Sequence, residues 1–167
     1  MRKFLFFLIF IFLLSGCTEQ VVPTENGIKI SIDPNPVSYS TEKDGWYFNI
    51  SIENLGSSKI YLSQAVITGT VRFLIFSFDL PEQILDSEEL QGLFGTNEIE
   101  PYKKITAEKG YTYQEIEEKI KPYEGYPGVS VNSFIAGTKL RIFIYGTVED
   151  GTPVDASTGI ITFSPKQ

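Results

Sequence analysis

The chain has 167 residues, with 14 basic and 21 acidic side chains, a formal net charge of −7 and no histidine. Without histidine it lacks the commonest general base and the commonest transition-metal ligand, which excludes Ser-His-Asp and Cys-His catalytic arrangements. The lysines are interleaved with glutamates and form no basic patch, so the composition also argues against nucleic acid as a partner.

The first seventeen residues have the layout of a secretory signal peptide. Two basic residues follow Met1, an unbroken apolar run occupies 4–14, and two small residues precede Cys17, the only cysteine. A membrane-spanning helix needs about 20 apolar residues, and this run is much shorter. We therefore predict cleavage before Cys17, with residues 1–16 as the signal peptide.

The tetrad Leu14-Ser15-Gly16-Cys17 resembles the lipobox of prokaryotic lipoproteins. In that family the cysteine is lipid-modified on sulfur and becomes the first mature residue, so the resemblance implies lipidation of Cys17. The two acyl chains of a diacylglyceryl group hold a protein stably on a bilayer. The resemblance thus implies an extracytoplasmic protein anchored to the cell membrane. In a cell with two membranes, Thr18 after the cysteine resembles an outer-membrane sorting signal.

Residues 17–27 are expected to be the lipidated cysteine and a short polar tether. Ten residues span at most about 35 Å when extended, so the folded part should lie close to the membrane. Cleavage would leave 12 basic and 21 acidic residues, a formal net charge of −9, and anionic headgroups would repel such a domain. With Cys17 modified no disulfide can form, and the fold must depend on its core.

From residue 28 onward, apolar and polar residues alternate in short runs. The expected strands are 27–33, 46–53, 59–67, 71–78, 140–145 and 159–163. Turn residues separate them, with Pro34 and Pro36 ending the first strand and Gly69 dividing the third from the fourth. Strands of this length and spacing predict a mostly β protein, an antiparallel β-sandwich in which 28–167 form a single domain.

The segment 46–62, which contains FNISIENLGSSKIYL, resembles the second and third strands of immunoglobulin-like modules on prokaryotic surfaces. There a strand ends in an Asn-x-Gly turn and the next strand returns. The resemblance implies an immunoglobulin-like sandwich, although the Cys…Trp…Cys arrangement of antibody domains is missing. Intracellular protease-inhibitor modules of bacilli share this architecture and remain a distant alternative.

Between about 79 and 138 the alternation lapses, and we expect a partly helical insertion there. Thr112 and Glu115 fit a capping box at a helix start, and Pro122 should end that helix. Its apolar face would consist of Tyr113, Ile116 and Ile120. A second short helix is expected after Ser87, with its inward side chains at Leu90, Leu93 and Phe94.

Several patterns suggest chemistry, and each has a plainer explanation. Ser40-Thr41-Glu42-Lys43 resembles the nucleophile motif of penicillin-recognising enzymes, but the companion tripeptides are missing. Asn49 begins an N-glycosylation sequon within a strand. Paired carboxylates can hydrolyse glycosides, yet a solvated acidic surface explains Glu88, Glu89, Glu98, Glu100, Glu117 and Glu118. Turn chemistry, rather than calcium, explains Asp33, Asn35, Glu149, Asp150 and Asp155. We expect no metal and no cofactor.

Aromatic residues are the better candidates for recognition. Five of the nine tyrosines fall in the expected insertion: Tyr102, Tyr111, Tyr113, Tyr123 and Tyr126. Tyrosine supplies broad contact area with a polar tip, and we select Tyr111, Tyr123 and Tyr126 as candidate ligand-binding residues. The alternative is that these rings seal one end of the sandwich. The run 71–78 is apolar on both faces, so we expect a helix of the insertion, or else a partner, to cover its outer face.

These patterns predict a lipid-anchored binding, adhesion or assembly module outside the cytoplasm, non-catalytic, with an envelope protein or a glycan as partner. Its expected site is a shallow, tyrosine-lined face. One alternative is a carboxylate-dependent envelope glycan hydrolase, which predicts two carboxyl groups converging in a deep pocket, one with a raised pKa. The other is a purely structural lipoprotein subunit, which predicts a large apolar patch without a pocket.

Overall fold

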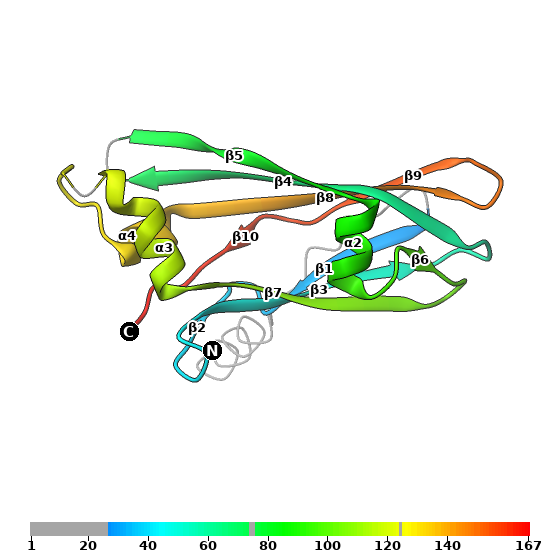
Figure 1. Ribbon diagram of the computed structural model, residues 1–167, viewed down its shortest axis with the longest axis horizontal. Coiled ribbons are helices and arrows are strands. Elements are labelled where there is room, and N and C mark those ends of the chain that lie inside the picture. Colours follow the sequence, from blue (N-terminus) through cyan, green and yellow to red (C-terminus); the bar gives the residue numbers. More distant parts are fainter. Residues whose placement is uncertain (1–26, 74–75, 124) are drawn as a thin grey trace, which may run out of the picture.

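Two antiparallel sheets face each other in the computed structural model, which describes residues 27–73, 76–123 and 125–167 (Figure 1). The predicted signal peptide, Cys17 and the tether up to residue 26 lie outside the described residues. Within the described residues, no helix has the length and apolar character needed to cross a bilayer. The predicted fold class, a mostly β antiparallel sandwich with a partly helical insertion, is confirmed.

The first sheet is built around β3 (Gly45–Asn54). One side of β3 pairs with β1 (Ile28–Asp33) and β2 (Tyr39–Ser40), and the other side pairs with β7 (Lys104–Thr112). The alternation expected from the sequence holds in β1 and β3: every second side chain faces the second sheet, and all of these are apolar except Asn54. β1 ends at Asp33, immediately before the first of the two prolines, as predicted.

The second sheet is built around two long strands, β4 (Ile60–Phe73) and β8 (Thr138–Val148), which pair over most of their length. β5 (Phe76–Asp86) and β6 (Glu98–Ile99) pair with the other side of β4. β9 (Pro153–Ser157) and β10 (Ile161–Thr162) pair with the other side of β8. β5 and β7 are therefore edge strands, one in each sheet.

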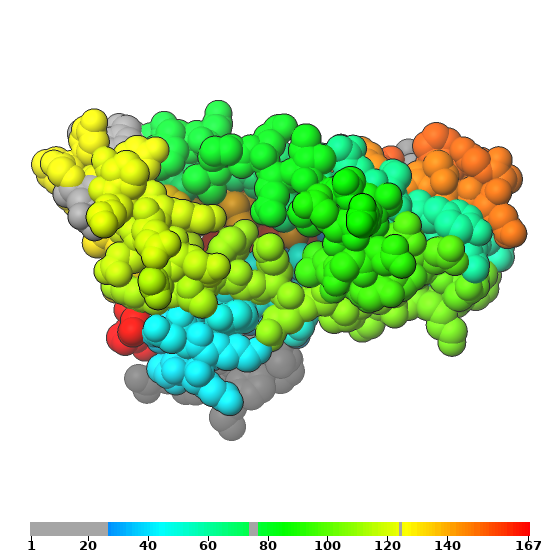
Figure 2. Space-filling view, viewed as in Figure 1, coloured from blue at the N-terminus to red at the C-terminus, as the bar shows by residue number. Residues whose placement is uncertain are grey.

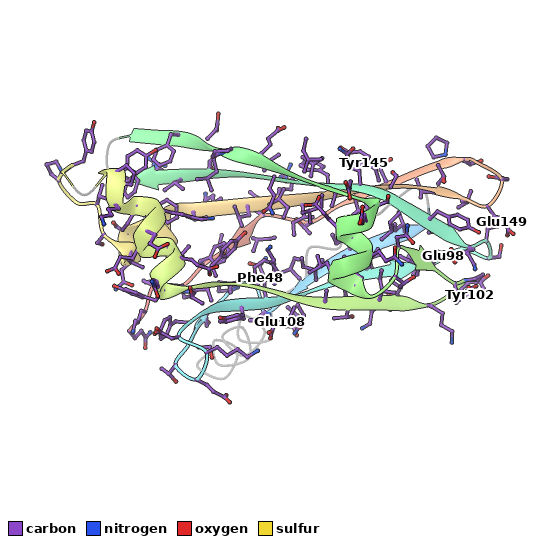
Figure 3. The ribbon with its side chains drawn as sticks, in the orientation of Figure 1. Phe48, Glu98, Tyr102, Glu108, Tyr145 and Glu149 are labelled. Carbon is purple, nitrogen blue, oxygen red and sulfur yellow. The ribbon has the colours of Figure 1, made fainter. Side chains whose placement is uncertain are left out.

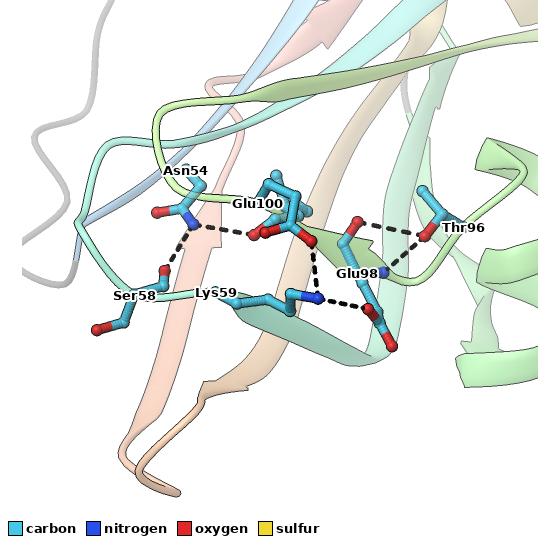
Figure 4. A network of polar contacts seen from close by, with 7 residues as sticks. Asn54, Ser58, Lys59, Thr96, Glu98 and Glu100 are labelled. Carbon is cyan, nitrogen blue, oxygen red and sulfur yellow. Dashed lines mark hydrogen bonds and ion pairs between the residues drawn. The ribbon is translucent and has the colours of Figure 1, made fainter.

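Asn54 holds the corner at which the chain crosses from the first sheet to the second (Figure 4). Its amide nitrogen donates to the carbonyl oxygens of Ser58 (2.8 Å) and Ile99 (3.0 Å), and its amide oxygen accepts from the backbone N–H of Gly56 (2.9 Å). The expected Asn-x-Gly turn is thus confirmed. Nearby, Lys59 pairs with Glu98 (3.1 Å) and Glu100 (2.7 Å), which ties β6 to the start of β4.

The expected division at Gly69 is wrong, because β4 continues through this residue to Phe73. The run 71–78, expected as one strand, is instead a hairpin in which Val71 pairs with Phe78 and Phe73 with Phe76. A Cβ at residue 69 would lie 2.5 Å from Cδ2 of Leu140. The glycine therefore marks close packing within a strand, next to a register shift in the pairing with β5, and not a turn.

The segment 79–138 contains helices, as expected: α2 (Ser87–Phe94), α3 (Tyr113–Ile120) with the 3₁₀ turn η1 (Lys121–Tyr123), and α4 (Val131–Gly137). The two predicted helices, α2 and α3, are confirmed. The segment also contains β6, β7 and most of β5, which the sequence pattern did not indicate. β7 was not predicted because its inward positions include Ala107 and Lys109, which makes the alternation of apolar and polar residues weak.

The helices lie between the sheets, and not on the outer face of the 71–78 run as expected. α2 packs against β4, β5 and β7, and α4 packs against α3 and β4 at one end of the sandwich (Figure 1). The Phe134 ring of α4 lies 6.4 Å from the Phe73 ring, centroid to centroid, and both side chains belong to the core. The hairpin is thus covered on its inner face, because that is where the two sheets diverge.

Replacing Asn54 by alanine should destabilise the fold strongly. This side chain is only 1% exposed, and its loss would leave buried carbonyl and N–H groups without partners. We expect the free energy of unfolding in urea to fall by about 2 kcal/mol. Asn49→Ala is the matched control, because Asn49 is exposed in the same strand. If both substitutions lowered the free energy of unfolding equally, the role assigned to the hydrogen bonds of Asn54 would be contradicted.

Candidate functional site

A groove of about 690 Å³ opens where the edge strands β5 and β7 fail to meet; we call it the side groove. It is visible in Figure 2 as a hollow between the green residues of β5 and the yellow-green residues of β7 and α3. Its floor is apolar and consists of Ile67, Leu80, Ile116, Phe134, Ile135 and Leu140. Most of these side chains belong to the core, so the side groove gives access to the interior of the sandwich.

The wall on the first sheet is fixed by the start of α3, which follows directly on β7. The hydroxyl of Thr112 accepts from the backbone N–H of Glu115 (3.2 Å), and the Glu115 carboxylate accepts from the backbone N–H of Thr112 (2.7 Å). These bonds form the predicted capping box. The Thr112 N–H and hydroxyl, which both donate to this carboxylate, lower the pKa of Glu115.

Tyr111, the last inward residue of β7, lines the side groove. Two lysine ammonium groups lie near its ring: the Nζ of Lys119 is 5.2 Å from the ring centroid and that of Lys109 is 6.0 Å away. Burial, with a smaller contribution from Glu115, raises the pKa of the Tyr111 hydroxyl. Tyr111 therefore remains a neutral hydrogen-bond donor at physiological pH, with two ammonium groups near its ring.

Tyr123 also lines the side groove, from the 3₁₀ turn after α3. Its ring stacks on Phe78 of β5 at 5.6 Å, which joins the two walls at the α3 end. Tyr126 is 59% exposed and is not part of the groove lining. Of the three predicted ligand-binding tyrosines, the structure thus brings Tyr111 and Tyr123 together in one cavity and leaves Tyr126 outside it.

The remaining tyrosines of the segment 79–138 lie outside the side groove. Tyr113 stacks on Trp46 at 6.2 Å, so it seals one end of the sandwich, as the alternative interpretation held. Tyr102 is 70% exposed at the opposite end of the molecule (Figure 3). The shallow, tyrosine-lined face expected from the sequence is replaced by a groove with an apolar floor and tyrosines at its rim.

The carboxylates considered for glycan hydrolysis have local structural partners or lie exposed outside the groove lining. Glu89 completes the capping box of α2, and Glu118 accepts from Gln114 (3.1 Å). Glu98 and Glu100 both pair with Lys59. The groove lining itself contains the carboxylates Asp79 and Glu82, both exposed on β5.

Of the residues considered for calcium or for serine chemistry, Asp150 and Ser40 take part in turns, as expected, whereas Asp33 and Asp155 lie within β1 and β9. Asp150 accepts from the backbone N–H of Thr152 (2.8 Å), which lowers the pKa of its carboxyl. Asn35 bonds to the backbone of Ile160 and Thr162. The Ser40 hydroxyl accepts from the backbone N–H of Lys43 (3.3 Å). Within the described part of the chain, no three carboxylate or thiol side chains gather where a metal ion could be held.

Comparisons with known proteins found similarity to solved structures only. The sequence matches no protein-family model and no curated protein. It is similar in structure to the Northeast Structural Genomics Consortium target SoR45, with 13% identity, a TM-score of 0.46, and coverage of 84% of this chain and 90% of that one. It is also similar to the putative ApaA protein from Bordetella pertussis, with 11% identity, a TM-score of 0.44, and coverage of 88% and 99%.

A third similar structure is the sporulation control protein Spo0M from Bacillus subtilis. The identity is 6% and the TM-score 0.39, with coverage of 87% of this chain and 51% of that one.

The sequence patterns did not identify the lysines beside Tyr111 or the floor of the groove as parts of a binding site. Lys109 has the charge of a surface residue, and only its register opposite Phe48 in β3 places it on the inward face. The one available signal was its spacing of two residues from both Ala107 and Tyr111, which becomes informative once β7 is known to be a strand.

The capping box that fixes the α3 wall should make the free energy of unfolding depend on pH in a defined direction. Because the folded state lowers the pKa of Glu115, its contribution to stability is present above about 4.5, the ordinary value, and is lost as the pH falls through the folded pKa. We therefore expect wild type to exceed Glu115→Gln in free energy of unfolding at neutral pH, and this difference to narrow below pH 4.5. Urea unfolding across this pH range measures it.

Glu117→Gln is the control for this experiment. It removes the same charge from an exposed position of α3 without touching the capping box. A constant difference between wild type and Glu115→Gln at all pH values would contradict the role assigned to the ionised carboxylate.

Proposed function

We propose that this protein is a lipid-anchored, extracytoplasmic binding module without catalytic activity, and that it recognises its ligand through the side groove. The observation that carries the proposal is an apolar floor reached from solvent between two edge strands. A cavity of about 690 Å³ falls in the range typical of small-molecule sites, which are mostly apolar with a few polar groups at fixed places.

The chemistry of the groove favours an apolar ligand over a glycan. Sugar hydroxyls placed on the floor would lose their hydrogen bonds to water without gaining others. Both carboxylates of the lining, Asp79 and Glu82, lie exposed on one wall, and this supports a site that binds without hydrolysing. Tyr111 and Tyr123 supply hydroxyl groups at the rim that can orient a polar end of the ligand.

Filling the groove should remove the ligand. Gln83 is an exposed residue of the lining, and Gln83→Trp would add a large ring at the opening. We expect native mass spectrometry of the full-length protein, purified from its own envelope, to show a bound small molecule that this variant loses. Gln91→Trp on α2 is the matched control, since Gln91 is exposed and outside the lining. Retention of the bound mass by Gln83→Trp would contradict the proposed site.

The lipid anchor is tested separately. Mass spectrometry of the native protein should find Cys17 as the first residue, carrying the mass of a diacylglyceryl group. Cys17→Ser should accumulate as a precursor that retains residues 1–16, because the lipobox cysteine is both the modified and the cleaved position in the family that this segment resembles. Thr18→Ser, which leaves the tetrad intact, should be processed normally. An intact Met1 or an unmodified thiol at Cys17 in wild type would refute the anchor.

A further inference from the structure

Lys119 lines the side groove and Lys109 lies close to its Tyr111, and neither forms an ion pair with a carboxylate of the described residues. Lys109 is partly buried on the inward face of β7, opposite the core residue Phe48, and Lys119 is exposed on α3. Both ammonium groups lie within 6.0 Å of the centroid of the Tyr111 ring. The ion pairs among the described residues involve Lys43, Lys59 and Lys166 only.

The carboxylates nearest these lysines are already engaged. Glu115 belongs to the capping box of α3, where the backbone and hydroxyl of Thr112 hold it. Glu108, the neighbour of Lys109 in sequence, pairs with Lys43. Coulombic attraction from Lys119 and Lys109 reaches Glu115 only as a minor influence on its pKa. The positive charge beside Tyr111 is therefore available to a ligand.

The opposite wall of the mouth has the opposite sign. Asp79 and Glu82 lie exposed along β5 and line the groove from that side. An anion at the mouth would be repelled from β5 and attracted to the wall formed by β7 and α3. The charge distribution thus favours the wall formed by β7 and α3, where the two ammonium groups lie beside Tyr111 and the Glu115 carboxylate is engaged by its capping box.

Below this polarised mouth the floor of the cavity is apolar. The stacked rings of Tyr123 and Phe78 join the walls near α3, and the floor continues along Leu80, Leu140 and Ile67. Tyr111 and Lys119, which also line the cavity, bring the polar groups next to this floor. A ligand that uses both features has an anionic head and a hydrocarbon chain.

We propose that the side groove binds a long-chain carboxylate. The head group lies between Lys109 and Lys119 and accepts a hydrogen bond from Tyr111, and the hydrocarbon chain lies on the floor beneath β5. This inference rests on the proposed function, which it makes specific by naming the ligand class. The anchor predicted at Cys17 would hold the groove near a membrane, where such amphiphiles are concentrated.

The test uses the full-length protein in vesicles and a palmitic acid analogue that carries a photoreactive diazirine on its chain. After irradiation, mass spectrometry of peptides should locate the label in β5 and α4, which contribute Leu80 and Phe134 to the floor. Labelling should fall about fivefold in the double variant Lys109→Gln/Lys119→Gln, as expected for the loss of two accessible ion pairs.

The matched control is Lys103→Gln/Lys104→Gln, which removes two exposed lysines at the other end of β7 and should label like wild type. A second probe, the uncharged hexadecanol analogue, should label the floor equally in all variants. This second result shows that the lysine substitutions leave the groove folded.

Three outcomes would overturn the inference. If the acid labels the floor equally with and without the lysines, the head-group site is wrong, although the groove still binds apolar ligands as the proposed function requires. If only a photoreactive phospholipid labels the floor, the ligand is not a free carboxylate. If neither single-chain probe labels the floor above the level of β1, the ligand class is wrong, and the Gln83→Trp experiment decides separately whether the groove binds anything.

Discussion

The fold depends on covering the apolar inner faces of two sheets that diverge from one another. Where the sheets separate, α3 and α4 lie at one end of the sandwich, and α2 packs between the two sheets further along (Figure 1). These helices contribute Leu90, Ile116, Phe134 and Ile135 to the same core as the strands. The helices thus keep the edge strands β5 and β7 apart, and the side groove is the part of the interface that they leave uncovered.

An aromatic cluster around Trp46 packs against the start of α3 and so supports this wall of the groove. The indole N–H of Trp46 donates to the carbonyl of Ser164 (2.7 Å), and its ring packs against Tyr39 and Tyr113. The ammonium group of Lys166 lies over these two tyrosine rings, at 4.4 and 4.9 Å from their centroids. Since Tyr113 is the first residue of α3, this cluster sets the position at which Tyr111 and Lys119 meet.

The features that the sequence predicted correctly are those that are determined by residues close together in the chain. Alternation identified β1 and β3, and the capping box at Thr112 identified α3, because each pattern is complete within a few residues. The pattern failed where long-range packing overrides it: Gly69 packs closely against Leu140 of another strand, and Lys109 stands on an inward face where an apolar residue is expected. Tyr111 and Tyr123 could be selected from residue type alone, but the groove depends on which strands form edges, and no local pattern encodes that.

The inward placement of Lys109 has a second consequence, for the edge of the sheet that β7 forms. An edge strand with unpaired backbone groups invites the sheet of a neighbouring copy to extend it, and a charge buried by such an extension opposes the process. β5 is protected in a similar way, by Pro81 and by the register shift in its pairing with β4. Both edge strands that flank the side groove therefore oppose extension of their sheets by a second copy of the chain.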